Sequence, residues 1–120
     1  LKSFLSAKGL LLVTSLCSSG FDIQLLWENS KSITPPHHIN FFSLEGFYHL
    51  FNRAGFSFID ISTPGILDID IVKNSIEENS GPNELGRFMQ KLITNEKAKD
   101  DFQKFLIRNN LSSHSWVFAK

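Results

Sequence analysis

Two adjacent histidines, His37 and His38, are the residues best suited to acid–base chemistry in this chain. An imidazole titrates near neutral pH, so it can take a proton from a reacting oxygen or nitrogen. Neighbouring side chains in extended backbone point to opposite sides, so we expect at most one of the two to face a pocket. The alternative is that both hold backbone carbonyls in a loop, with His38 and Asn40 fixing the start of a helix at Ser43. The pair lacks a third spaced ligand, so we predict no metal site.

Several other reactive side chains each have a functional and a structural interpretation. Cys17, the single cysteine, has no identifiable base beside it, and a small buried thiol is the commoner role. Asp22 and Glu28 either contact a polar ligand or are solvated loop carboxylates. Trp27 either walls a pocket or covers a sheet edge. We interpret Asp68 as a helix N-cap rather than as half of a metal-binding pair.

The elements that must position these residues alternate between strand and helix patterns, which is typical of an α/β protein. An apolar run predicts a strand over 10–16 that should be buried on both faces. Spaced apolar residues predict strands over 56–62 and over 114–119. Apolar residues at helical spacing predict a helix in the first eight residues, one from Ser43 to Gly55, one over 66–78, and two capped by Asn83 and Asn95. The segment 18–40 shows no clear periodicity and is expected to be a long connection.

Composition excludes several classes of protein. A chain of 120 residues forms one domain, and 42% hydrophobic residues can build its core. Twelve basic and twelve acidic residues cancel, so no nucleic-acid or anionic membrane partner is predicted. The longest apolar run is far shorter than a bilayer span. A single cysteine excludes an internal disulfide and fits a reducing, cytoplasmic location.

Several short motifs resemble, in their order and spacing, the C-terminal half of class I S-adenosylmethionine-dependent methyltransferases. In that family a Leu-Lys-Pro-Gly-Gly turn precedes a buried strand, a His-x-Asn-aromatic-Phe-Ser stretch leads into a helix closed by Ala-Gly-Phe, and a last strand ends the domain. The matching residues here are 5–9 before the strand 10–14, 38–43 before the helix closed by 54–56, the turn 63–65, and 116–120. Ala7 and Lys8 depart from the family by replacing the proline and the first glycine.

The resemblance implies a partial Rossmann-like methyltransferase fold made by one domain, 1–120. Its short three-stranded mixed sheet would carry the C-terminal strand 114–119 antiparallel in the middle, between 10–16 and 56–62, with helices packed around it. The helices at about 76–110 would be an insertion.

The resemblance also implies a cofactor, S-adenosylmethionine, that this chain does not hold by itself. The family binds it through a glycine-rich turn and an acidic residue, but no Gly-x-Gly-x-Gly run occurs here. We therefore expect the cofactor-binding half to lie upstream of Leu1 and this chain to be inactive alone. Ligands of open α/β sheets lie beyond the carboxyl ends of the strands. We expect a small-molecule acceptor to be contacted there by Ser15, Cys17, Ser18, Asp22, Trp27 and Asn40, with His37 or His38 as the base.

Two partner predictions follow. The free edge of the strand 10–16 should pair with the upstream half, and without it the edge should self-associate or be covered by a terminal helix. The competing hypothesis is a non-enzymatic protein-binding or assembly module that uses the helices at 83–110.

Overall fold

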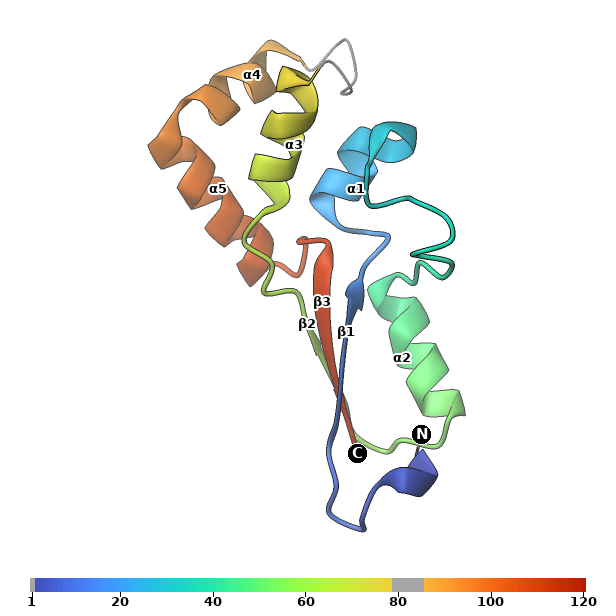
Figure 1. Cartoon of the computed structure of the whole chain (residues 1–120). Helices are drawn as coiled ribbons and strands as arrows, with labels where there is room; N and C mark the ends of the chain where they lie inside the picture. The colour runs from blue at the N-terminus through green and yellow to red at the C-terminus, as the bar shows by residue number, and fades with distance from the viewer. Residues whose placement is uncertain (1, 79–85) are drawn as a thin grey trace.

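A computed structural model describes residues 2–78 and 86–120, and it has a sheet at one end and helices at the other (Figure 1). The principal extents are 52 × 31 × 17 Å. The strands are β1 (Leu11–Leu16), β2 (Ile59–Ser62) and β3 (His114–Ala119). The helices are α1 (Phe21–Leu26), α2 (Leu44–Arg53), α3 (Asp68–Glu77), α4 (Arg87–Thr94) and α5 (Glu96–Arg108), with 3-10 turns η1 (Lys2–Phe4) and η2 (Trp27–Asn29).

The three strands form one sheet in the order β1-β3-β2. β3 lies antiparallel to both neighbours, and Val117 is level with Val13 on one side and Ile61 on the other. The prediction that the last strand lies antiparallel in the middle is therefore confirmed. The prediction of a mixed sheet is wrong, because both pairings are antiparallel; the two outer strands run parallel to each other without touching.

Helix α2 covers one face of the sheet and builds an apolar core there. It begins at Ser43, whose hydroxyl accepts a hydrogen bond from the Gly46 amide at 3.1 Å, as the N-cap prediction required. It ends before Gly55, which takes φ +85°, a backbone conformation that favours glycine. Residues from the helix, the turn after it and β3 form the core, namely Phe47, Phe51, Phe56, Val117 and Ala119.

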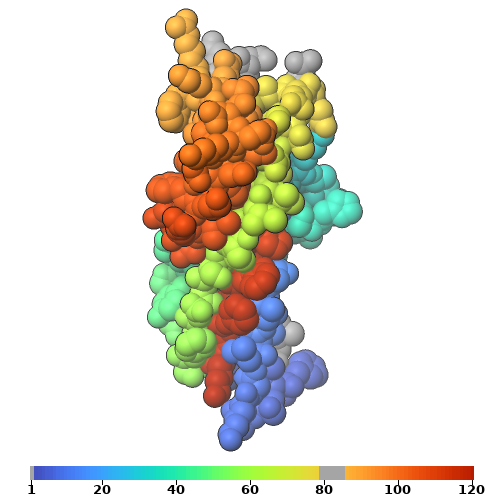
Figure 2. Space-filling model, turned by 90° about the vertical axis from the view of Figure 1, so that its left-hand side faces the viewer, coloured from blue at the N-terminus to red at the C-terminus, as the bar shows by residue number. Residues whose placement is uncertain are grey.

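The opposite face of the sheet is open to solvent. Figure 2 shows it, with β2, β3 and β1 side by side at the surface below the helices. Leu12 is 47% exposed and Trp116 is 39% exposed on these strands. The expectation that the first strand is buried on both faces is therefore wrong, because no described helix packs on this side of it.

Four helices form a second apolar core at the other end of the molecule. Leu26 of α1, Ile69 and Val72 of α3, Ile93 of α4 and Leu106 of α5 are its buried members. The rings of Phe21 and Phe102 meet edge to face beside it, with centroids 5.3 Å apart. None of the described helices has both the length and the apolar character that a membrane span needs.

Further predictions can be compared with these elements. The helix over 66–78 exists as α3, and Asn95 caps α5 by accepting a hydrogen bond from the Ala98 amide at 3.0 Å. The segment 18–40 was expected to lack regular structure but contains α1, a helix of six residues. The predicted helix in the first eight residues is wrong, because residues 2–8 contain the three-residue turn η1 and no longer helix. The predicted cap Asn83 lies outside the described residues.

Candidate functional site

Five buried polar side chains meet where β1 and β2 end and β3 begins. They are Asp22 of α1, Asp68 of α3, Gln103 of α5, and Ser112 and Ser113 of the loop before β3. We call this group the polar junction. Buried polar groups are stable only when they are hydrogen-bonded, so the partners of each carboxylate determine what the junction can do.

Both carboxylate oxygens of Asp68 accept hydrogen bonds. Its Oδ2 accepts hydrogen bonds from the Ser112 hydroxyl at 2.7 Å and from Nε2 of Gln103 at 2.6 Å, and its Oδ1 accepts one from the Ser113 amide at 2.7 Å. Gln103 is held in turn, because its Oε1 accepts from the Ile69 amide at 3.2 Å. The predicted N-cap role of Asp68 is wrong. Leu67 occupies the cap position, and the Asp68 carboxylate crosses to the loop before β3 instead.

Asp22 is buried as completely as Asp68, but its carboxylate has weaker hydrogen bonding. The residue is 0% exposed, and no described donor reaches either carboxylate oxygen within the distance and angle of a full hydrogen bond. The pKa of Asp22 is raised to about 6, mainly by burial and also by the neighbouring Asp68, while the nearby Ser113 side chain lowers it. The Ser113 contact therefore compensates the buried charge only in part.

Glycine allows the backbone to close around the junction at two positions. A Cβ atom on Gly20 would lie 2.1 Å from Cα of Ser113, and one on Gly65 would lie 2.2 Å from the Ser112 hydroxyl. Neither distance is sterically allowed. The turns before α1 and α3 can approach Ser112 and Ser113 only because Gly20 and Gly65 have no side chain.

A cavity of about 390 Å³ lies between α1, the loop after it and α3, and we call it the His38 pocket. Leu26 and Ile71 give it an apolar floor, and an ion pair between Lys31 and Glu78 joins the loop to α3. The His38 ring packs edge to face against Phe41, with centroids 5.9 Å apart. An apolar cavity with a few polar groups is the usual form of a small-molecule site. The other lining residues are Ser32, Asn74 and Ser75.

A second cavity, of about 270 Å³, borders the polar junction, and we call it the Trp116 pocket. Asp68 and Ser113 contribute to its wall, and Ile71 lines this pocket as well as the His38 pocket. Its remaining lining is mainly apolar, from the ends of β1 and β3 and from the turn before α3: Leu16, Pro64, Gly65, Ile66, Leu67, Ile71, His114 and Trp116.

Among the predicted site residues close to β1, Cys17 is buried and Ser15 and Ser18 are half-buried. The Ser15 carbonyl accepts a hydrogen bond from the Ser115 hydroxyl at 2.9 Å, and Ser18 accepts one from Nε2 of Gln24 at 2.7 Å. Cys17 is 0% exposed, with its sulfur 3.0 Å from the Ser19 hydroxyl. Cys17 thus has no surface for a ligand in this structure.

The remaining predicted residues divide between the sites and the surface. Asp22 belongs to the polar junction and His38 to the His38 pocket. His37, Trp27 and Asn40 are exposed and line neither pocket. Within 2–78 and 86–120, no three His, Cys, Asp or Glu side chains are grouped so that they could hold a metal ion.

Sequence reasoning missed Gln103, Ser112 and Ser113, and it assigned Asp68 a different role. Ser113 is 45 residues from Asp68 along the chain, so no local pattern connects them. Gln103 lies in a predicted helix, but a single glutamine among charged residues predicts a position on the protein surface. The one available signal was the pair of serines directly before a predicted strand, which by itself indicates only a turn.

Comparison with known protein families, curated proteins and solved structures finds no match for this chain. The resemblance to methyltransferases therefore rests on the sequence motifs and on the order of the strands.

Proposed function

We propose that this chain is the C-terminal, acceptor-side part of an S-adenosylmethionine-dependent methyltransferase that acts on a small molecule. The observation that supports the proposal most is the strand order. The resemblance required the last strand to return antiparallel between its two predecessors, and β3 lies between β1 and β2 in that orientation. β1 and β2 follow each other in the chain but are separated in the sheet by β3, whereas consecutive strands are usually neighbours.

The His38 pocket is the proposed acceptor site, because it lies beyond the carboxyl end of β1 and holds a predicted base. Its apolar floor suits the body of a small molecule, and His38 suits a hydroxyl or amine whose proton must be removed during transfer. S-adenosylmethionine, when bound, supplies an electrophilic methyl group. This chain has no glycine-rich turn for it, so we assign cofactor binding to an upstream segment.

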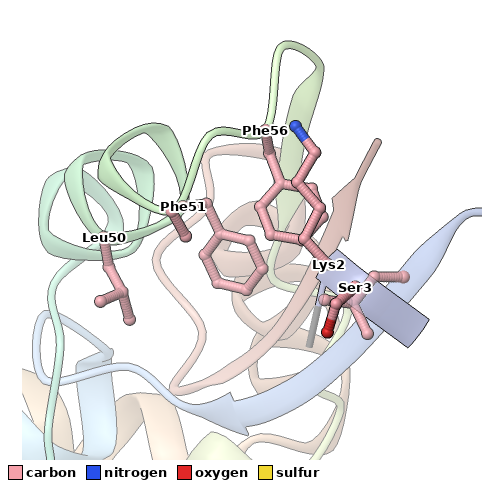
Figure 3. Close-up of a pocket in the computed structure, with 7 residues that line it drawn as sticks. Lys2, Ser3, Leu50, Phe51 and Phe56 are labelled. Atoms are coloured by element: carbon pink, nitrogen blue, oxygen red, sulfur yellow. The ribbon is translucent and has the colours of Figure 1, made fainter. Parts of the chain in front are cut away.

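The free edge of β1 is the proposed contact with that segment. Among the described strands, β1 pairs with β3 alone, and an isolated parallel bridge between Cys17 and Phe42 lies just past its end. Leu10, before the strand, is 56% exposed. An apolar cavity of about 380 Å³ lies next to this strand, between η1 and α2, where the side chains of Phe51 and Phe56 turn toward Lys2 (Figure 3). A partner strand with an apolar neighbour would cover both features. Without it, we expect the chain to self-associate through this edge, which sedimentation analysis would detect.

Calorimetry with S-adenosylhomocysteine tests the proposal, using this chain and a version extended upstream in the same reading frame. We expect binding by the extended version only. His38→Gln in the extended version should leave this binding intact, because His38 serves the acceptor and not the cofactor. Failure of the extended version to bind would refute the methyltransferase proposal.

A protein-binding module is the second candidate, and one exposed side chain favours it. Phe88 of α4 is 76% exposed and borders an apolar hollow with Leu92 and Ala98. Large exposed rings are common anchors of protein interfaces. If the extended version does not bind the cofactor and Phe88→Ser abolishes capture of a specific protein partner, this second function replaces the first.

A further inference from the structure

The polar junction joins the two helices that form the walls of the His38 pocket. Asp22 lies in the first turn of α1, and Leu26, later in the same helix, is part of the pocket floor. Asp68 begins α3, and Ile71 of that helix completes the floor. The separation of the two helices at the junction therefore determines the width of the pocket.

The two buried carboxyl groups cannot both be ionised without a large energetic cost. Asp68 has three full hydrogen-bond donors, and these stabilise a negative charge on it. Asp22 has no donor of that quality and lies against Asp68. A proton on Asp22 removes the repulsion and adds an O–H donor that can bind the Asp68 carboxylate.

We propose that Asp22 and Asp68 share one proton under mildly acidic conditions and that its loss near neutral pH loosens α1 from α3. Both are positioning residues, because they act on the pocket through the helices that carry them. The consequence for acceptor binding rests on the proposed function, whereas the change in helix packing does not.

Among the described groups, Asp68 is the ionisable group that acts on Asp22, and His114 at the start of β3 lines the Trp116 pocket beside Asp68. From α1 the Ile23 amide favours the ionised form, and from the loop before β3 the Ser113 side chain does the same. From α5 the neutral Gln103 contacts Asp68. Lys99 of α5 is engaged elsewhere, in ion pairs with Asp70 at 3.0 Å and Glu96 at 2.9 Å.

The sign of the pH effect follows from burial. The pKa of Asp22 is about 6 in the folded protein, against an ordinary value of 3.8. The folded state thus holds the proton more tightly than the unfolded state does. The stabilisation that this proton gives to the folded state is complete below about pH 4. It decreases between about pH 4 and about pH 6 and is lost above about pH 6.

Denaturant unfolding of the full chain over a range of pH tests the proposal, with Asp22→Asn as the variant. The asparagine amide is neutral at every pH and can still donate to Asp68. The folding equilibrium constant of this variant relative to the wild type should rise about 100-fold between about pH 4 and about pH 7. Asp60→Asn, at an exposed position of β2, is the matched control and should keep the wild-type profile. A constant ratio for Asp22→Asn would overturn the proposal.

Hydrogen exchange of the wild-type chain keeps the test decisive if the variant does not fold. After correction for intrinsic rates, amides of α1 should lose about tenfold or more of their protection as the pH rises through about 6, and at neutral pH they should exchange faster than amides of β3. Constant protection of α1 across this range would overturn the proposal. Neither experiment contains cofactor, so a failed pH effect and a failed methyltransferase assignment remain distinguishable.

Discussion

The sheet end and the helical end of the molecule are held together in different ways. At the sheet end, α2 packs on β3 through five apolar residues, and the backbone ladders of the strands complete the structure. At the helical end, an apolar core of similar size is joined to the sheet through the buried polar junction. The sheet end is therefore insensitive to charge, whereas the attachment of the helices depends on two carboxyl groups.

The overall dimensions reflect this division. The Cα radius of gyration is 16.4 Å, above the roughly 14 Å of a compact domain of this length. Two small cores lie end to end instead of merging into one. The comparison teaches that the chain places its buried polar side chains where the two cores meet, beside the Trp116 pocket.

Truncation of one core residue at each end should give the largest effects. Phe51→Ala should destabilise the protein by about 4 kcal/mol and Leu106→Ala by about 3 kcal/mol, because each leaves a cavity in a packed core. In the double variant the losses should add to within about 0.5 kcal/mol, since the residues belong to separate clusters. Denaturant unfolding measures all three, and a coupling above about 1 kcal/mol would show that the two cores are one.

Substitution of a glycine at the junction should destabilise the protein nearly as much as truncation of a core residue. Gly20→Ala brings a methyl group against the backbone of Ser113 and should cost about 3 kcal/mol. Gly86→Ala is the matched control, because nothing lies within 4 Å of its added Cβ, and its effect should stay within about 1 kcal/mol. Equal melting temperatures for the two variants would contradict the close approach at Gly20.

Loss of the Asp68 charge should reduce the unfolding free energy by less than the glycine substitution does. Asp68→Asn removes one acceptor oxygen and the charge that three donors share, so we expect a loss of about 2 kcal/mol in unfolding free energy. Asp70→Asn, two residues along the same helix, breaks only a partly exposed ion pair and should cost under about 1 kcal/mol. The reverse ranking would show that Asp68 is not the centre of the junction.

Helix caps should give the smallest effects, similar at both ends. Ser43→Ala at the sheet end and Asn95→Ala at the helical end each remove one side-chain cap, and each should cost about 1 kcal/mol. Thermal unfolding measures both. A cap that can be removed without effect would mean that tertiary packing alone determines where that helix begins.

The regular elements of the sheet end could largely be predicted from the sequence. Ser43 and Gly55 mark the limits of α2, and Phe47 and Phe51 lie one helical turn apart, so local pattern and final structure agree. The central position of β3 came from the family resemblance, because periodicity alone says nothing about strand order. The exposure of Leu12 was missed, since an apolar run does not reveal which face a helix will cover.

The helical end could be predicted only in part. α1 has six residues, fewer than two turns, which is too short for a periodic signal. His38 was identified as a candidate, but the residues opposite it lie on α3, and no spacing in the sequence joins them. The pairing of Asp22 with Asp68 could not be predicted for the same reason. From the sequence alone, each is interpreted as a surface carboxylate or a helix cap.

The central claim is that Asp22 carries a proton in the folded protein under conditions where an ordinary aspartate does not. Carbon-13 NMR of the side-chain carboxyl groups, with Asp22 assigned by comparison with Asp22→Asn, measures this directly. The account predicts a titration midpoint of about 6 for Asp22. A midpoint close to the ordinary value of 3.8 would contradict it, because Asp22 would then be an ionised carboxylate whose burial has no effect on the attachment of the helices.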